Sequence, residues 1–216
     1  MNLIGHSQGG VAGRYVAGVR PDIVASLTSI GTPHNRPKKG LDLSDVLFNE
    51  DISIAGVTGS DILEAAFNIF GDVAVWFSGG DQPNDAQALA EFARNRFDVF
   101  NQEFPQALPV SDSCASGEEV VNGVRYYSMS GTARLTTGVD PSDALLVLLG
   151  GVLNVDDASD GAVGRCQSHL GKVIRDNYLM NHFDENNGLY GLVYPFSTNP
   201  KTMYRKHANF LKNIGL

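Results

Sequence analysis

The sequence predicts an α/β fold, with a mostly parallel sheet that carries helices on both faces. An apolar, partly β-branched run at 24–30 is typical of a buried strand, and apolar residues over 86–104 recur at helical spacing. Such elements alternate along the chain without an internal repeat. With 216 residues the chain is long enough for one sizeable core and short for two, so we expect a single domain over 1–216.

Composition excludes several classes of protein. The net charge of −8 disfavours a nucleic-acid binder, which needs clustered Lys and Arg, and a hydrophobic fraction of 43% is typical of a globular chain. The longest apolar run, 144–149, is far short of the roughly 18–20 residues of a membrane span. No secretory signal is evident at the N-terminus. The 2 cysteines fit either two free thiols or one disulfide.

The first elements are a strand, a glycine-rich turn, a helix and a second strand. Residues 1–4 form a short, mostly apolar segment that leads into Gly-His-Ser-Gln-Gly-Gly at 5–10. The helical stretch 11–19 ends ahead of Pro21, because the residue before a proline avoids the helical region. The run 24–30 then predicts a strand buried on both faces of a parallel sheet.

The middle of the chain predicts a loop, a crowded apolar segment and a helix. Residues 34–60 have the composition of a loop, and 61–77 hold more apolar residues than one helical face can bury. Asn84 is predicted to cap a helix, with Gln87 at the capping-box position, and Pro105 is predicted to end it. Its apolar stripe comprises Ala86, Leu89, Ala93, Phe97, Phe100 and Phe104.

The last third predicts a hairpin, a strand and a terminal helix. Asn122-Gly123, between 120–121 and 124–128, is typical of a two-residue hairpin turn, and 170–174 could supply a buried strand. Pro200 fits the first turn of a helix. The apolar stripe of that helix comprises Tyr204, His207, Ala208 and Leu211.

The turn at 5–9 matches the G-x-S-x-G pattern of a nucleophile elbow, and the flanking strand and helix match its context. We expect both Gly5 and Gly9 to be required, because only residues without a Cβ fit beside a serine in so sharp a bend. The bend exposes the Ser7 hydroxyl and leaves the Gln8 amide able to donate to an oxyanion. The alternative is an ordinary glycine-rich turn.

A nucleophilic serine needs a base, and on such an elbow the chain order is serine, acid, histidine. That order leaves three histidines. His207 lies on the stripe of the terminal helix, where a buried core histidine is the better interpretation. His169 precedes the predicted strand, at the wrong end for a catalytic loop. His182 follows that strand, at the carboxyl end where open α/β sheets carry their active sites, and is therefore favoured as the base.

The acid should lie on a loop before the last strand. Three aspartates there are candidates, namely Asp156, Asp157 and Asp160. Asp160 precedes a glycine and is best placed to turn its carboxylate inward, but spacing alone does not decide among the three.

Several segments, in order along the chain, together resemble the secreted bacterial triacylglycerol lipases that depend on a dedicated foldase. They are 2–10, 14–17, 31–34, 140–143, 159–161 with Gly164 and Cys166, 181–185, 207–209 and 211–212. The resemblance covers almost the whole chain. It implies an α/β-hydrolase fold and a serine hydrolase that cleaves acylglycerol esters through an acyl-enzyme. It also implies Ser7 as nucleophile, Asp160 as acid and His182 as base.

The resemblance further implies one disulfide and one structural calcium ion (Ca2+). The disulfide joins Cys114 to Cys166, 52 residues apart. The calcium ligands would be the carboxylates of Asp140 and Asp184 and the backbone carbonyls of Gly188 and Leu192, an oxygen set that suits a hard cation. Bound there, calcium would hold the loop of the base. Gly188 departs from the family, which usually has glutamine at this position.

By the same resemblance, a lid covers the site at about 56–80. The apolar residues of 62–77 would shield the site in water and open against a lipid–water interface, although an ordinary buried helix is the alternative. The implied partners are that interface, the acylglycerol substrate and the foldase chaperone. We expect an extracellular, secreted monomer that binds no nucleic acid and has no transmembrane segment.

The chain begins inside the elbow strand, whereas a complete hydrolase has βα units ahead of it. We therefore expect the C-terminal part of a lipase, without its N-terminal strands and second oxyanion donor, and weakly active or inactive by itself. Two alternatives stay open. One is another α/β-hydrolase activity, as an esterase, thioesterase or acyltransferase; the other is an inactive fragment that binds a lipid surface or the foldase.

Overall fold

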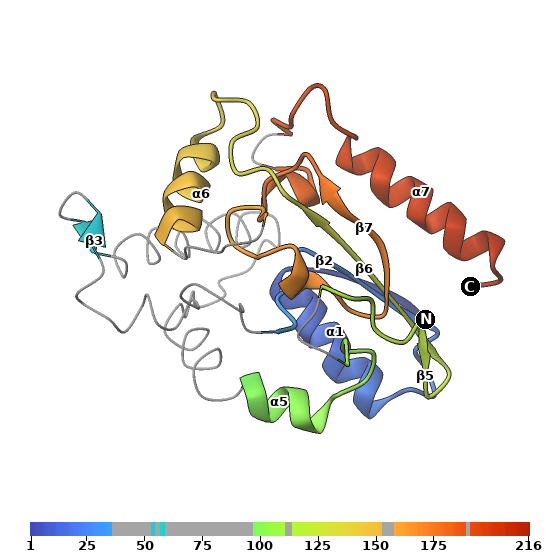
Figure 1. Ribbon diagram of the computed structural model, residues 1–216. Helices are drawn as coiled ribbons and strands as arrows, with labels where there is room; N and C mark the ends of the chain where they lie inside the picture. The colour runs from blue at the N-terminus through green and yellow to red at the C-terminus, as the bar shows by residue number, and fades with distance from the viewer. Residues whose placement is uncertain (36–52, 55–56, 59–96, 111–113, 153–157, 189–190) are drawn as a thin grey trace, which may run out of the picture.

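The computed structural model describes residues 1–35, 53–54, 57–58, 97–110, 114–152, 158–188 and 191–216 (Figure 1). The strands are β1 (Asn2–His6), β2 (Ser26–Ile30), β3 (Ser53–Ile54), β4 (Val57–Thr58), β5 (Val120–Val121), β6 (Val124–Gly131) and β7 (Lys172–Tyr178). The helices are α1 (Gln8–Val19), α5 (Phe97–Glu103), α6 (Pro141–Val152) and α7 (Pro200–Asn213), with one-turn helices η1 (Cys166–Ser168) and η2 (Asp184–Asn186).

The main sheet is parallel except for one short strand. β2 lies between β1 and β6, β7 pairs with β6 in parallel, and β5 pairs antiparallel with the start of β6. Every residue of β2 is buried, as predicted for a strand covered on both faces. The carboxyl ends of β1, β2, β6 and β7 therefore meet at one edge of the sheet.

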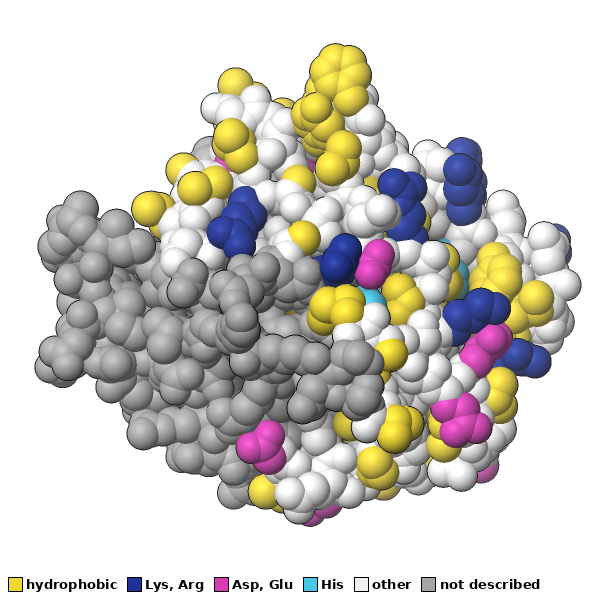
Figure 2. Space-filling view, in the orientation of Figure 1, with side chains coloured by type: hydrophobic (Ala, Val, Ile, Leu, Met, Phe, Trp, Pro, Cys, Tyr) yellow, Lys and Arg dark blue, Asp and Glu magenta, His cyan; other side chains and the backbone are white. Residues whose placement is uncertain are grey.

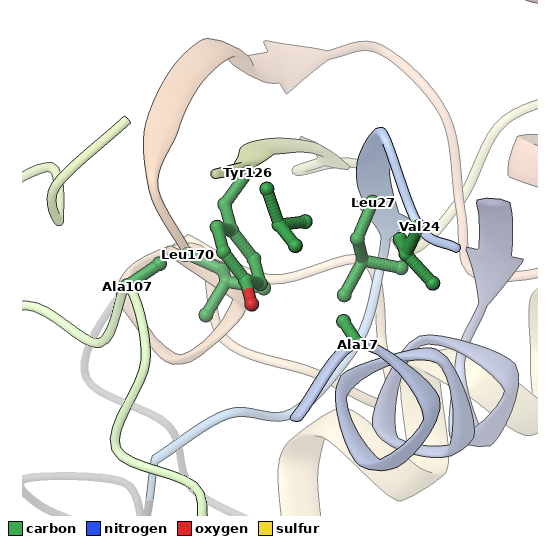
Figure 3. Close-up of a cluster of buried hydrophobic side chains, with 7 residues drawn as sticks. Ala17, Val24, Leu27, Ala107, Tyr126 and Leu170 are labelled. Carbon is green, nitrogen blue, oxygen red and sulfur yellow. The ribbon is translucent and has the colours of Figure 1, made fainter. Parts of the chain in front are cut away.

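Two apolar clusters hold helices against opposite faces of this sheet. Figure 3 shows the first, in which Ala17 of α1 packs near Leu27 of β2 and Tyr126 of β6. In the second, Met203 and Tyr204 of α7 pack against other side chains of the same strands. The prediction of a mostly parallel sheet with helices on both faces is confirmed.

The hairpin turn and the terminal helix also form where the sequence predicts them. Asn122 and Gly123 both have positive φ, 52° and 82°, as the tight hairpin turn requires. Pro200 begins α7 and the Asn199 side chain caps it. The predicted stripe is slightly rotated, because Met203 is buried in α7 whereas Ala208 is exposed.

Helix α6 is the longest described element that the sequence did not predict. Leu146 and Leu149 are buried, but Val147 and Leu148 on the other side are about half exposed. Figure 2 shows exposed hydrophobic side chains over this helix. Because α6 is apolar on every side, it has no amphipathic period by which a helix is recognised.

Three predictions fall wholly or largely outside the described residues. The lid at 56–80 is described only at Val57–Thr58, which forms β4, and the helix from Asn84 only from Phe97 onward, where it is α5. Within the predicted loop 34–60, β3 and β4 form a short antiparallel pair. None of the helices in the described ranges has the length and hydropathy needed to cross a bilayer.

Candidate active site

Ser7 occupies a sharp turn between β1 and α1, at the carboxyl edge of the sheet. Its φ of 53° and ψ of −128° form a conformation that costs free energy for any residue with a side chain. Its N–H donates to the carbonyl oxygen of Ile30 at the end of β2, 2.9 Å away. The strand before it and the helix after it thus hold the serine as the elbow pattern predicts.

The two glycines of the elbow differ in their surroundings. A Cβ on Gly5 would overlap the backbone carbonyl of Gly9, so no larger residue fits at Gly5. A Cβ on Gly9 would meet no described atom within 4 Å. Against the described residues, the prediction that both glycines are sterically required is therefore correct for Gly5 and wrong for Gly9. The second crowded position is Gly10, where a Cβ would overlap the Thr32 side chain.

Ser7, His182 and Asp160 form one hydrogen-bonded line. His182 Nε2 lies 3.0 Å from Ser7 Oγ, and His182 Nδ1 lies 2.7 Å from Asp160 Oδ2. Because a carboxylate only accepts, Nδ1 carries the proton and Nε2 has a lone pair for the serine hydroxyl. The structure therefore brings together the three residues that the sequence selects from far apart in the chain.

The carboxylate of Asp160 is held rigidly. Its side chain is fully buried, and its Oδ1 accepts the N–H groups of Ala162 and Val163 at 2.8 and 2.7 Å. The carbonyl oxygen of Asp160 also accepts the N–H of His182 at 2.9 Å. These bonds fix the carboxylate and the base relative to each other, which spacing along the sequence could not show.

Gln8, the predicted oxyanion donor, is the first residue of α1. The first N–H groups of a helix have no carbonyl partner within the helix, and they carry its positive dipole end. An oxyanion formed on a substrate beside Ser7 would meet this amide.

The other histidines considered for the base lie elsewhere. His207 is buried against β2, with its Nε2 2.6 Å from Thr28 Oγ1, and burial lowers its pKa to about 4. His169 bonds Asp176 and Ala115 instead of the serine. Both exclusions made from the sequence hold in the structure.

Two residues beside the base were missed by the sequence analysis. The ring centroid of His6 lies 4.6 Å from that of His182, and its Nε2 is 3.3 Å from Glu185 Oε2. Burial, and then the charge of Asp160, raise the pKa of Glu185 well above its usual range. No local signal points to this pair, because 179 residues separate the two side chains, as the numbering 185 − 6 shows.

The side chain of Asn181 holds the loop that carries His182 in place through hydrogen bonds. The Asn181 side-chain oxygen accepts the N–H groups of Phe183 and Asp184, and its amide donates to Asp143 at 2.9 Å. Asp143 in turn accepts N–H and hydroxyl groups from the loop 136–138. Asn181 thus ties the backbone around His182 to the first turn of α6.

Replacing Asn181 with alanine is expected to lower kcat roughly 10- to 100-fold with a smaller change in KM, because a displacement of about 1 Å in the base has such an effect. Steady-state kinetics on a soluble ester tests this. Asn177→Ala is the matched control, since Asn177 is exposed and bonds Arg175 on β7. Equal kcat in the two variants would show that Asn181 does not position the base.

The four predicted calcium ligands lie in one region. Asp140 and Asp184 are buried, and Asp140 Oδ2 and Asp184 Oδ1 have no hydrogen-bond partner among the described residues. A Cβ built on Gly188 would lie 3.4 Å from Asp184 Oδ1 and 3.1 Å from the Leu192 carbonyl oxygen. Burial, with the charges of Asp140 and Asp143 adding to it, raises the pKa of Asp184 to about 6. Unpaired buried carboxylate oxygens beside a carbonyl fit a hard cation.

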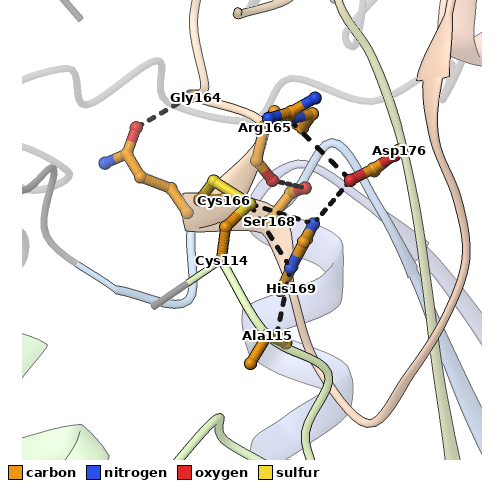
Figure 4. Close-up of a disulfide and its surroundings, with 9 residues drawn as sticks. Cys114, Ala115, Gly164, Arg165, Cys166, Ser168, His169 and Asp176 are labelled. Carbon is orange, nitrogen blue, oxygen red and sulfur yellow. Dashed lines mark hydrogen bonds and ion pairs between the residues drawn. A yellow bond between two sulfur atoms is a disulfide. The ribbon is translucent and has the colours of Figure 1, made fainter. Parts of the chain in front are cut away.

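Cys114 and Cys166 form a disulfide, with a Cα–Cα distance of 4.8 Å (Figure 4). Of the two possibilities left open by composition, the disulfide is therefore the correct one. It ties the segment before β5 to η1, and His169 lies against it.

Removing this disulfide with the pair Cys114→Ala and Cys166→Ala is expected to lower the free energy of unfolding by about 4 kcal/mol, for a loop of 52 residues. Denaturant unfolding of the oxidised protein and the double variant measures the difference. A loss below about 1 kcal/mol would mean that the unfolded chain is hardly restrained by the bond.

This chain has known relatives over its full length. No family model matches it. It is 46% identical to a triacylglycerol lipase of Vibrio cholerae, covering 100% of this chain and 67% of that protein. Triacylglycerol lipases of Burkholderia plantarii and Pseudomonas fragi are 35% and 34% identical, with 67% and 74% of their lengths covered.

A solved structure agrees in fold. The crystal structure of a Bacillus licheniformis lipase in its mature form matches with a TM-score of 0.55 at 14% identity, over 98% of this chain and 65% of that one. Together with the mostly parallel sheet, this likeness shows an α/β-hydrolase fold. Because these relatives are 34–46% identical to it over 100% of its length, the chain belongs to the triacylglycerol lipases, a family of hydrolases.

Proposed function

We propose that this chain hydrolyses carboxylic esters of acylglycerols, with Ser7 as nucleophile, His182 as general base and Asp160 as the orienting acid. The observation that carries the proposal is the position of His182, whose Nε2 lies 3.0 Å from Ser7 Oγ while Nδ1 lies 2.7 Å from Asp160. The names of the relatives, all triacylglycerol lipases, supply the substrate class.

The geometry supports an acyl-enzyme route. His182 Nε2 accepts the hydroxyl proton as Ser7 Oγ bonds to the ester carbonyl carbon, and the Gln8 N–H donates to the oxyanion. His182 returns the proton to the departing alcohol oxygen, which leaves an acyl group on Ser7. A water molecule then gives a proton to His182 Nε2 as its oxygen bonds to the acyl carbon. His182 returns that proton to Ser7 Oγ as the bond between Oγ and the acyl carbon breaks, which releases the fatty acid and the free serine.

The test combines labelling with substrate choice. A fluorophosphonate probe should label Ser7, as found by peptide mass spectrometry, and an emulsified triglyceride should be hydrolysed. Short soluble esters, acyl thioesters and alcohol acceptors distinguish the esterase, thioesterase and acyltransferase alternatives. Labelling at another serine would refute the proposed nucleophile.

We also propose that one calcium ion is held by Asp140, Asp184 and the carbonyls of Gly188 and Leu192. The unpartnered buried oxygens of the two carboxylates support this, as does the convergence of Gly188 and Leu192 on Asp184. Gly188 has a φ of 56°, a left-handed conformation that suits glycine. The loop conformation therefore accommodates glycine at the position where the family usually has glutamine. Calcium there would neutralise the buried charge two residues from His182.

Chelation of calcium at pH 8 is expected to lower the melting temperature of the wild-type protein. The same treatment should leave the melting temperature of the Asp184→Asn variant unchanged. Without the ion, a pKa of about 6 at Asp184, above the unfolded value of 3.8, makes the folded state bind more protons, so stability falls as pH rises from 3.8 through 6. The calcium-dependent difference in melting temperature should therefore shrink below about pH 6. An equal effect of the chelator on Asp184→Asn would contradict the site.

Further proposals come from the sequence resemblance. The protein would be exported, fold with a dedicated foldase and act as an extracellular monomer at a lipid–water interface, with a lid in 56–80. The disulfide between Cys114 and Cys166 supports export, because such bonds persist in oxidising compartments. Co-expression with and without a foldase, followed by assay of the culture medium, tests export and foldase dependence together.

A further inference from the structure

Two imidazoles and two carboxylates lie together beside the nucleophile. One ligand atom from each of His6, His182 and Glu185 lies within 4.8 Å of the other two. The His6 and His182 rings are tilted by 43°, and the carboxylate of Glu185 lies against His6. Imidazole nitrogens with a carboxylate oxygen form a ligand set that zinc and similar divalent transition metals prefer.

One of the three distances between ligand atoms already fits a tetrahedral ion. Zinc bonds of about 2.0–2.1 Å place neighbouring ligand atoms roughly 3.3 Å apart. His6 Nε2 and Glu185 Oε2 are already 3.3 Å apart. A rotation of the His182 side chain would complete the set, at the expense of a bond to Ser7 or Asp160.

The charge around these residues also favours a cation. Glu185 Oε2 is buried and has no hydrogen-bond partner among the described residues, while its Oε1 accepts the N–H of Gly131. The Asp160 carboxylate belongs to the same group of side chains, with its Oδ2 2.7 Å from His182 Nδ1. Within the described ranges, no Lys or Arg forms an ion pair with either carboxylate, and His6, with 11% of its side chain exposed, borders solvent.

We propose that His6, His182 and Glu185 form an inhibitory site for zinc or a similar divalent transition metal, separate from the calcium site. The bound ion takes a lone pair of His182, so the ring can no longer accept the Ser7 proton in line with Asp160. Calcium does not compete there, because it prefers oxygen ligands in larger numbers. The inhibition, though not the binding of the ion, rests on the proposed role of His182.

The test uses the full chain with saturating calcium. Zinc chloride should reduce hydrolysis of a soluble p-nitrophenyl ester, and EDTA followed by calcium should restore it. His6→Ala and Glu185→Gln should each raise the half-inhibitory zinc concentration at least about tenfold, measured against the metal-free rate of the same variant. His169→Gln is the control, since His169 pairs with Asp176 away from this cluster, and its zinc sensitivity should not change.

Cobalt(II) gives a readout that does not depend on activity. Cobalt should produce the visible absorption of a tetrahedral nitrogen and oxygen site in the wild type and in inactive Ser7→Ala, and zinc should displace it. If His6→Ala does not fold, His6→Phe keeps the ring volume without the ligand. Unchanged zinc sensitivity in these variants, or no cobalt spectrum in Ser7→Ala, would overturn the site. Cobalt binding without zinc inhibition would overturn the inhibitory role and point to a different base.

Discussion

Ser7→Ala is expected to lower ester hydrolysis on the order of 10⁶-fold, because loss of a nucleophile in a serine, histidine and acid triad has an effect of that size in other hydrolases. The hydroxyl oxygen of Ser7 lies 3.0 Å from Nε2 of His182, within hydrogen-bonding distance. Hydrolysis of emulsified triglyceride and of a soluble ester, with the melting temperature recorded alongside, measures the loss separately from folding.

Ser130→Ala is the matched control for this prediction. The Ser130 hydroxyl is buried and has no hydrogen-bond partner among the described residues, so its removal should leave activity intact. If Ser7→Ala kept more than a small fraction of the wild-type rate, another residue would have to be the nucleophile.

Gly5→Ala is expected to destabilise the protein by about 3 kcal/mol or more, whereas Gly9→Ala should be neutral or stabilising. The Cβ of alanine at Gly5 would overlap the Gly9 backbone, which cannot move without disrupting the elbow. At Gly9 the new Cβ meets no described atom, and alanine in a helix is favoured over glycine by roughly 0.5–1 kcal/mol. Denaturant unfolding of the two variants gives the comparison.

The pair of variants is informative because each is the control for the other. Both glycines stand two residues from Ser7 in the same pattern, so a general sensitivity of the turn would affect both. Equal destabilisation by the two substitutions would mean that the crowding at Gly5 is not what makes the turn depend on glycine.

The sequence predicts best those features that depend on neighbouring residues. The elbow around Ser7, the hairpin at Asn122-Gly123 and the start of α7 each follow from a few adjacent residues with defined backbone preferences. The choice of His182 followed from the order of elements and from the chemistry of carboxyl-end loops.

What the sequence could not provide are contacts across the fold. Asp160 is held by two backbone N–H groups and by the ring of His182, contacts that do not follow from the spacing of the aspartates. The other two candidates, Asp156 and Asp157, lie outside the described residues. The disulfide and the calcium ligands came from family resemblance rather than from local pattern. The pairing of His6 with Glu185 depends on β1 and η2 meeting at the sheet edge, a tertiary event without a sequence signal.

The distance along the chain between nucleophile and base has a consequence for biosynthesis. Ser7 and His182 are 175 residues apart, and the base is in place only after β7 has joined β6. At about 5–20 residues per second, a ribosome needs roughly 9–35 s to add that length. Throughout this interval the nascent chain carries Ser7 without His182 beside it, so the proposed nucleophile has no base to accept its proton.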